Sequence, residues 1–272
     1  MNDITSRRIG FLGGGAMAEA LAGGLRAAGL APDRMIAADP DPARRKHLEE
    51  HLAIATTSDN AAAVDGADVV VIAVKPGVVA SALHGLSRAE PRPLWISIAA
   101  GVSLPSLAVP LSRGARIVRA MPNTPALVGA GATAICGNAD ATTEDLALAT
   151  ALFESVGTCW TAPDESLLDA VTGLSGSGPA YVFVFLEALA DAGVRVGLPR
   201  DAASQLATQT VLGAAKLASE AGRHPAQLKD QVTSPGGTTI AGLERLEAGG
   251  LRAAVYEAVA AATARSRELG GS

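Results

Sequence analysis

The chain has 272 residues, of which 49% are hydrophobic, 18% are charged and 3% are aromatic, and its formal net charge is −5 at pH 7. This balance excludes a disordered chain and predicts one large or two ordinary domains built around Ala, Val, Leu and Ile. The acidic charge without a basic run argues against a nucleic-acid partner. No uninterrupted apolar run approaches the roughly 18 residues of a membrane span, and the start of the chain lacks a signal segment. We therefore expect a cytoplasmic protein with no membrane partner.

The first half of the chain alternates short apolar strands with helical segments. Residues 16–28 have helical spacing and are followed by Gly29, a typical helix stop. The run "DVVVIAV" is nearly all β-branched, which is typical of a strand buried on both faces. Strands are predicted at residues 8–12, 35–38, 68–74, 94–99, 116–119, 133–136 and 158–160. Their alternation with helices predicts a mostly parallel sheet with right-handed crossovers.

The pattern changes after Pro163. Asp164 is a candidate N-cap, and helical periodicity continues from there to the end, without further strand signals. The sequence therefore predicts an α/β domain over residues 1–163 and an all-helical domain over residues 164–272.

A dinucleotide-binding motif follows the first predicted strand. In "GFLGGGAMAEAL", Gly13, Gly15 and Ala18 fit G-x-G-x-x-A at the start of a helix. The first glycine permits a tight turn, the second lets a pyrophosphate approach the backbone, and the alanine keeps helix and strand close. The N–H groups and the dipole of the helix N-terminus attract the phosphates. This motif predicts a Rossmann-like domain.

The end of the second predicted strand leaves the choice of cofactor open. Asp39 lies where an acidic residue commonly binds the adenosine ribose of NADH, and its charge repels a 2′-phosphate. Arg44 and Arg45 follow, however, and a guanidinium could bind the 2′-phosphate of NADPH. Each arginine is equally consistent with a solvated helix position.

Further loops follow later strands, at the edge where ligands of open α/β sheets bind. They are "AVKPG" at residues 73–77 and "RAMPNTPALVG" at residues 119–129. Asn123 and Thr124 could bind the nicotinamide carboxamide, and Lys75 could act as an acid or stay a solvated loop residue. Asn60 could face the adenine ribose or cap a helix.

Several residue types that carry chemistry are missing or badly placed. His47 and His51 lie one helical turn apart in a charged segment and are interpreted as a solvated face, so no metal site is predicted. Cys136 and Cys159 lack metal-like spacing and are interpreted as two buried thiols in a reducing compartment, with a disulfide as the alternative. No lysine occurs between Lys75 and the distant Lys216, so a lysine base of the β-hydroxyacid dehydrogenase type is absent. An enzyme that lacks a strong acid–base residue should reduce a group that is already activated, such as an imine that is protonated in solution.

The segment "SPGGTT" interrupts the helical half at residues 234–239. It offers backbone N–H groups and hydroxyls ahead of a helix predicted to begin near Ile240, with no bulky side chain to compete. We interpret it as a small anion site, with an ordinary interhelical loop as the alternative.

Long segments of the helical half resemble pyrroline-5-carboxylate reductase. They are "VTGLSGSGPAYV", "EALADAGVRVGLPRDAASQLATQTVLGAAKL" and "HPAQLKDQVTSPGGTTIAGL", and "AVKP", "AAGV" and "MPNTP" resemble the same family. The resemblance covers nearly the whole chain. It implies NADPH- or NADH-dependent reduction of the cyclic imine Δ1-pyrroline-5-carboxylate to L-proline, the last step of proline synthesis. It also implies a helical dimerisation domain and homodimers that can assemble into decamers.

The resemblance also implies roles for individual residues. Thr239 matches the hydroxyl that the family directs at the ring nitrogen and is the predicted catalytic residue. The predicted substrate contacts are Ser234, Gly236, Gly237, Thr238 and Thr239. The predicted cofactor contacts are Gly13, Gly15, Ala16, Met17, Ala18, Asp39, Asn60, Ala73, Val74, Lys75, Pro76, Ala100, Gly101, Asn123, Thr124 and Pro125.

Other functions remain open at this point. A β-hydroxyacid dehydrogenase or a broader imine reductase would share the first domain, and a dinucleotide sensor would need no second anion site. Many relatives carry a small hydroxyl residue where this chain has Asp39. The preferred cofactor, the proton donor, the assembly and the range of imino acids therefore stay undecided.

Overall fold

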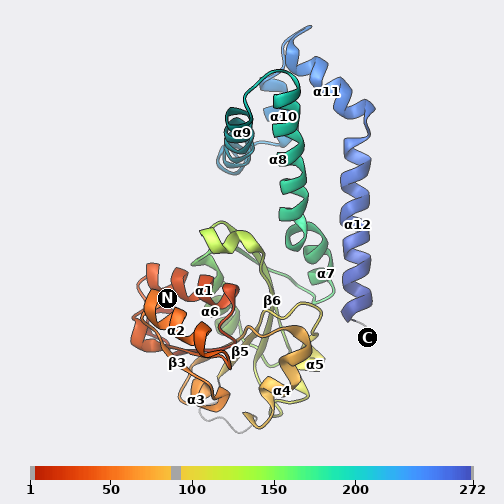
Figure 1. The fold of residues 1–272 in the computed structure, drawn as a ribbon. Coiled ribbons are helices and arrows are strands. Elements are labelled where there is room, and N and C mark those ends of the chain that lie inside the picture. The colour runs from red at the N-terminus through yellow and green to blue at the C-terminus, as the bar shows by residue number, and fades with distance from the viewer. Residues whose placement is uncertain (1–3, 87–92, 271–272) are drawn as a thin grey trace. The chain divides into compact units, whose positions relative to one another are not determined.

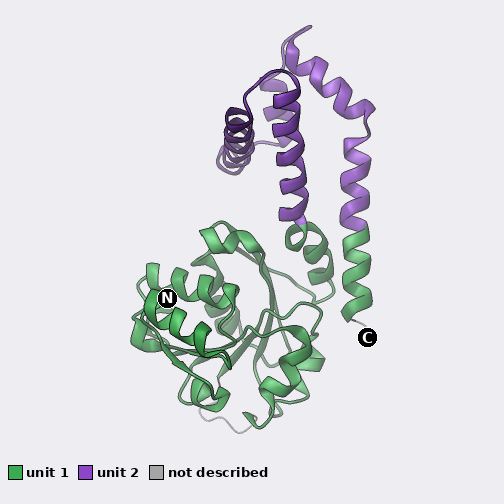
Figure 2. Ribbon diagram, in the orientation of Figure 1, with its two compact units in different colours: residues 1–177, 261–272 green, residues 178–260 purple. Residues whose placement is uncertain are grey.

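The computed structural model describes residues 4–86 and 93–270 (Figure 1). They form two compact units, which Figure 2 distinguishes by colour. Unit 1 comprises residues 1–177 and 261–272, and unit 2 comprises residues 178–260. The predicted architecture, a Rossmann-like α/β domain followed by helices, is confirmed.

Unit 1 is built on an eight-stranded sheet in the order β3-β2-β1-β4-β5-β6-β7-β8. The strands are β1 Ile9–Leu12, β2 Met35–Ala38, β3 Ala55–Thr57, β4 Val69–Ile72, β5 Leu94–Ser97, β6 Ile117–Met121, β7 Gly131–Gly137 and β8 Gly157–Thr161. Only the β6–β7 pair is antiparallel. Every predicted strand is present, with shifted ends, and the short β3 was not predicted.

Helices cover both faces of this sheet. They are α1 Ala16–Ala27, α2 Pro42–Leu52, α3 Asn60–Val64, α4 Val79–Leu83, α5 Leu104–Ala108, α6 Thr143–Glu154 and α7 Leu167–Val171. Short turns are η1 Ile4–Ser6, η2 Pro32–Arg34, η3 Pro76–Val78 and η5 Thr124–Val128, and η6 Thr172–Gly176 is a π-helix. All four residues of β4 are buried, and alternate residues belong to separate apolar clusters on the two faces. This explains its unbroken β-branched run.

Helix α1 begins directly after the glycine run and ends as predicted. Gly29 has φ +102°, and the amide of Leu30 donates to the carbonyl of Leu25 at 2.9 Å. This left-handed ending satisfies carbonyls of the last helical turn.

The boundary between the units differs from the predicted boundary after residue 163. The structure divides the chain after Ser177, so α7 and η6 belong to unit 1. Glu165 accepts hydrogen bonds from Nη1 of Arg119, at 2.7 Å, and from the amide of Leu104, at 2.8 Å. These bonds attach the first residues of the helical region to the sheet. Asp164 is not the cap of α7, because its carboxylate accepts from the amide of Ser166 instead.

The last turns of α12 (Leu251–Gly270) also belong to unit 1. Ser266 is buried, and its Oγ donates to Oδ1 of Asp169 at 2.7 Å. Asp169 lies in α7, so a side-chain bond between residues 97 positions apart joins the end of the chain to unit 1. The helical periodicity of the sequence does not indicate that the end of the chain packs against unit 1.

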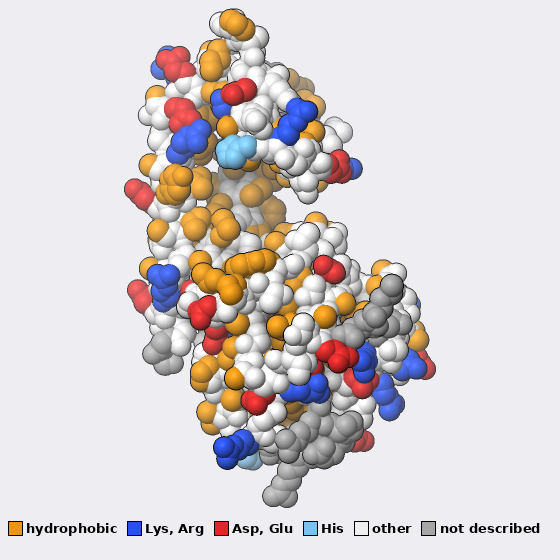
Figure 3. Space-filling model, turned by 180° about the vertical axis from the view of Figure 1, so that it is seen from behind, with side chains coloured by type: hydrophobic (Ala, Val, Ile, Leu, Met, Phe, Trp, Pro, Cys, Tyr) orange, Lys and Arg blue, Asp and Glu red, His pale blue; other side chains and the backbone are white. Residues whose placement is uncertain are grey.

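Unit 2 consists of helices whose apolar residues are only partly covered. They are α8 Gly178–Arg195, α9 Arg200–Ala221, α10 Pro225–Gln231, α11 Thr238–Ala248 and the first part of α12. Ala203 and Ala207 of α9 are buried, whereas 55% of Leu206 is exposed. In α8, Phe183 and Val184 are 63% and 67% exposed. Figure 3 shows apolar side chains spread over this part of the surface.

One helical stretch of the described residues, Leu167–Arg195, is long and apolar enough to cross a membrane. The sequence analysis predicts no membrane-spanning run, so this stretch differs from that expectation. Only 11% of its most apolar window is buried, so it presents an apolar surface.

We expect two adjacent glycines of α1 to respond in opposite ways to alanine. A Cβ on Gly24 would lie 2.4 Å from Cγ1 of Val156 and 2.7 Å from the carbonyl oxygen of Ser155, whereas a Cβ on Gly23 would meet only Cδ2 of Leu52, at 3.8 Å. Gly24→Ala should lower the free energy of unfolding by about 1–3 kcal/mol through overpacking. Gly23→Ala should raise it by about 0.5–1 kcal/mol, the usual helix preference for alanine. Urea unfolding measures both, and equal effects would show that α1 does not approach the turn between α6 and β8 this closely.

Candidate functional site

The predicted cofactor residues gather at one edge of the sheet. Strands β1, β2, β4, β5 and β6 are parallel, and each is followed by at least one predicted contact. The order of strands reverses at β1, which lies between β2 and β4. Ligands of open α/β sheets bind at such a switch point, beyond the carboxyl ends of the strands. The sheet therefore brings together residues that are far apart in sequence.

The glycine loop after β1 fits the phosphates of a dinucleotide. Gly13 has φ +95°, and a Cβ there would lie 2.9 Å from the carbonyl oxygen of Ala73, so only glycine allows this turn. Gly15 caps α1 without a side-chain bond, and the space around its missing Cβ is open to 4 Å. The first intrahelical bond of α1 runs from the amide of Glu19 to Gly15. The amides of residues 16–18 are thus the helix N–H groups that an anion can approach.

Asp39 holds this loop in place. Its Oδ2 accepts from the amide of Gly14 at 2.8 Å, and its Oδ1 accepts from the amide of Asp41 at 2.9 Å. Gly14 was not predicted as a site residue, although a Cβ there would lie 2.8 Å from Cδ1 of Leu48. The run of three glycines was the available signal. Asp39 therefore has a structural role beside the ribose contact predicted for it.

The arginines after Asp39 are partnered within the protein. Arg44 donates from Nε to the carbonyl of Gly14 and pairs through Nη2 with Glu19. Arg45 donates from Nη1 to the carbonyl of Asp39, at 2.7 Å, and to that of Pro40, at 3.1 Å. Both guanidinium groups lie next to the loop that follows β2.

The side chain of Asn60 is bonded within the protein, whereas that of Lys75 is exposed. Asn60 begins α3, but the cap is Asp59, whose carboxylate accepts from the amide of Ala61 at 2.9 Å. The Asn60 amide donates to the carbonyl of Ala82 at 3.0 Å. Lys75 is exposed after β4 and has no ion-pair partner among the residues that the structure describes. Lys75 therefore keeps its charge available at the edge of the sheet, whereas Asn60 supports the packing of α4.

Asn123, after β6, is a structural residue. It is buried, its Oδ1 accepts from the amide of Ala132 at 2.8 Å, and its Nδ2 donates to the carbonyl of Ser175 at 3.0 Å. It thereby ties the loop to β7 and to the π-helix η6. Thr124 is exposed and Pro125 half-buried, so these neighbours are the more accessible members of the loop.

A cavity of about 440 Å³ opens beside Pro76, Ala100 and Gly101, three of the predicted cofactor residues. Its other walls come from η6 and from the end of α12. They are Thr172, Ser177, Ala262, Arg265, Ser266 and Leu269. None of these was predicted. No signal in the sequence could have identified those of α12, because the return of this helix to unit 1 is a tertiary feature.

The predicted substrate residues lie in unit 2, around the start of α11. Gly236 has φ +66°, and Gly237 caps α11 without a side-chain bond. The helix begins at Thr238, slightly before the predicted start, and its first intrahelical bond runs from Ala241 to Gly237. The amides of residues 238–240 are thus open to an anion. Gly236 and Gly237 also line a cavity of about 570 Å³ within unit 2.

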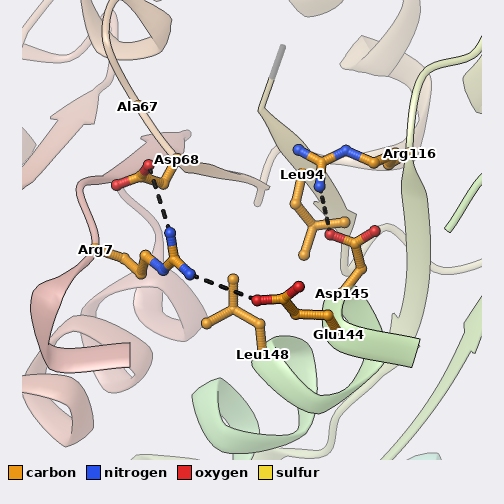
Figure 4. Close-up of a pocket in the computed structure, with 8 residues that line it drawn as sticks. All are labelled: Arg7, Ala67, Asp68, Leu94, Arg116, Glu144, Asp145 and Leu148. Carbon is orange, nitrogen blue, oxygen red and sulfur yellow. Dashed lines mark hydrogen bonds and ion pairs between the residues drawn. The ribbon is translucent and has the colours of Figure 1, made fainter. Parts of the chain in front are cut away.

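Another cavity, of about 240 Å³, lies at the opposite edge of the sheet, where the strands begin (Figure 4). Its lining charges are paired with one another. Arg7 lies 4.0 Å from the carboxylates of Asp68 and Glu144, and Arg116 lies 2.7 Å from Asp145. This cavity is at the wrong edge for a dinucleotide, and its ion pairs connect α6 to the sheet.

The cysteines are free thiols. Burial raises the pKa of both, that of Cys159 to about 11, so both stay protonated at neutral pH. Among the described residues, no group of three His, Cys, Asp or Glu side chains could hold a metal ion.

The likeness to known proteins extends over both units. Residues 165–269 match the family model for pyrroline-5-carboxylate reductase dimerisation, and residues 8–101 match that for coenzyme F420-dependent NADP oxidoreductases. The pyrroline-5-carboxylate reductase of Synechocystis sp. is 51% identical over 97% of this chain and 99% of its own, and that of Escherichia coli is 42% identical over 98% and 99%.

Solved structures agree with this. The pyrroline-5-carboxylate reductase of Coxiella burnetii superposes with a TM-score of 0.93 at 40% identity, covering 97% of this chain and 98% of the other. The pyrroline carboxylate reductase of Plasmodium falciparum, solved with NADP bound, gives 0.85 at 33% identity over 97% and 98%. Since the likeness covers essentially the full length of both chains, the chain belongs to the pyrroline-5-carboxylate reductase family.

Proposed function

We propose that this chain reduces Δ1-pyrroline-5-carboxylate to L-proline with NADPH or NADH. Family membership over the whole length supports the reaction. The observation that carries it in the structure is the glycine loop with open N–H groups at the start of α1, which suits a dinucleotide pyrophosphate. The reduced nicotinamide supplies the hydride when it is bound. A cytoplasmic location, expected for a reductase that uses a soluble cofactor, is part of the proposal.

The residues of unit 1 bind and orient the cofactor in this proposal. The amides of residues 16–18 hold the pyrophosphate, and Asp39 keeps the loop in the required shape through Gly14. The segments after β4, β5 and β6, with Lys75, Ala100 and Thr124, border the nicotinamide. Asn123 fixes the last of these segments and is not proposed to touch the cofactor, because both ends of its amide are already bonded within the protein.

The segment 234–239 holds the substrate in this proposal. The open amides at the start of α11 bind the carboxylate, with the helix dipole adding attraction. Thr239 directs its hydroxyl at the ring nitrogen, which takes its one proton either from solvent before the hydride arrives or from this hydroxyl when the imine binds unprotonated. No strong acid or base is required, because the imine is protonated in solution. Positioning therefore supplies most of the rate.

A steady-state assay tests the activity directly. The purified chain is incubated with pyrroline-5-carboxylate and either NADPH or NADH, and the loss of reduced nicotinamide is followed by absorbance. We expect turnover with at least one cofactor and formation of L-proline. Turnover with a β-hydroxy acid and not with the imine would overturn the proposal, and binding of dinucleotide without any turnover would identify a sensor.

Variants of the segment 234–239 test the substrate site. A side chain on Gly237 would extend toward Ser234, whose Oγ lies 2.3 Å from the position of a Cβ. Gly237→Val should raise the KM for the imine about tenfold or more, because obstruction removes a hydrogen bond to a charged group worth about 1.5–3 kcal/mol, and leave cofactor affinity unchanged. Gly242→Ala, within α11 and with open space around its Cβ, is the control and should change neither.

Thr239→Val should lower kcat/KM by roughly tenfold to a hundredfold, because it loses a hydrogen bond to a charged nitrogen. Thr239→Ser retains the hydroxyl and should preserve most of the activity. Proline should inhibit competitively with the imine, and more weakly in the valine variants. Unchanged imine kinetics in Gly237→Val, in a protein that remains folded by circular dichroism, would identify the segment as an ordinary loop.

We also propose that residues 164–272 act as the substrate-binding and dimerisation region of a homodimer, which can assemble further into a decamer. The dimerisation family match and the exposed apolar residues of α8 support this. Phe183→Asp should weaken self-association in sedimentation velocity experiments. Val109→Asp, at a residue that is 85% exposed and outside the matched region, should not. A stable, active monomer at low protein concentration would contradict the proposal.

A further inference from the structure

The segment that follows β2 carries residues that favour different cofactors, NADH and NADPH. An acidic residue at this position generally accepts hydrogen bonds from the ribose hydroxyls of NADH, whereas a nearby arginine accommodates the 2′-phosphate of NADPH. This chain carries Asp39 together with Arg44 and Arg45. Which cofactor it prefers therefore depends on which of these charges is available to the ligand.

The side chain that decides this availability comes from a different element. Glu19 lies in the first turn of α1 and pairs with two groups of α2. One carboxylate oxygen, Oε2, pairs with Nη2 of Arg44, and the other, Oε1, lies 2.8 Å from Nε2 of His47. Nε of the same arginine is bonded to the carbonyl of Gly14. One carboxylate thus pairs with both Arg44 and His47, whereas Arg45 donates to the carbonyls of Asp39 and Pro40.

The charge of Glu19 is secure at neutral pH. Burial raises the pKa of this carboxyl. The hydrogen bonds from His47 and Arg44 together lower it by more than burial raises it, so the pKa lies below its usual value. The carboxylate therefore offsets the guanidinium charge throughout the physiological range. The oxygens of Asp39, in contrast, accept bonds from uncharged backbone amides. Among the residues that the structure describes, no cationic side chain pairs with the carboxylate of Asp39.

We propose that Glu19 sets the cofactor preference of this chain, by pairing with Arg44 and His47 so that Asp39 favours ribose hydroxyls over a 2′-phosphate. The inference rests on the proposed function only for the identity of the cofactor as NADPH or NADH. It makes Glu19 a specificity-determining residue that acts through Arg44. It also predicts that the unaltered chain binds NADH at least as tightly as NADPH.

The test compares the dissociation constants of NADPH and NADH, measured without imine by titration of the nicotinamide fluorescence. Glu19→Gln keeps the shape of the side chain and removes its charge, so Arg44 becomes free to pair with the 2′-phosphate. We expect the affinity for NADPH relative to NADH to increase about tenfold, the effect of one hydrogen bond between charged groups. The affinity for NADH itself should stay within about twofold, because the N–H groups of the loop are unaffected.

The matched control is Glu50→Gln, which removes the same charge from α2. Glu50 is exposed and pairs with Lys46 at 3.7 Å, away from the glycine loop. The ratio of the two affinities should change less than about twofold in this variant, because solvent screens exposed charges. An equal shift in both variants would show a general charge effect and overturn the role of Glu19.

The double variant Glu19→Gln, Arg44→Gln should lose the gain, because the group that binds the phosphate is gone. A gain that persists there would assign the phosphate to Arg45 and overturn the proposal. An unaltered chain with a strong preference for NADPH, or a Glu19→Gln variant with an unchanged ratio, would do the same. Because binding is measured without imine, a chain that fails to reduce pyrroline-5-carboxylate would disprove the proposed reaction and leave this test intact.

Discussion

The cofactor site depends on the close approach of two chain segments at the switch point of the sheet. The loop after β1 passes so near the loop after β4 that a Cβ on Gly13 would lie 2.9 Å from a backbone oxygen of Ala73. This approach turns the chain sharply, starts α1 at the edge of the sheet and leaves its first amides without partners. An anion there meets N–H groups that need no rearrangement. The loops after β4 and β5 then form the adjoining part of the same edge.

The surroundings of this loop also explain why its residues have more than one role. Asp39 binds the amide of Gly14, and Arg44 binds the carbonyl of the same residue. Side chains of the segment that follows β2 therefore also determine the shape of the glycine loop. A substitution at Asp39 changes the charge near the ligand and the support of the loop together. Among the described residues, the Glu19 carboxylate bonds to the side chains of Arg44 and His47, so its charge can be altered with less effect on the backbone.

The helices of unit 2 leave many of their apolar side chains exposed. Its helices are rich in alanine and leucine, and a single chain covers only part of their apolar surface, as Phe183 and Leu206 show. The hydrophobic effect favours covering such a surface with another apolar protein surface. The start of α11 differs from these apolar faces, because its exposed residues are glycines and hydroxyl residues.

The sequence by itself determined the sheet, the glycine loop and the family, because buried β-branched strands and glycine turns have strong local signatures. It also predicted that the segments with the candidate cofactor residues follow parallel strands, which share one edge of the sheet. It did not predict the burial of Asn123, the pairing of Glu19 with Arg44, or the boundary after Ser177. Those features depend on contacts between residues far apart in the chain, such as Ser266 with Asp169. Periodicity and motifs report which face of an element is apolar, but only the folded chain decides which polar side chains meet, and whether each is left for a ligand.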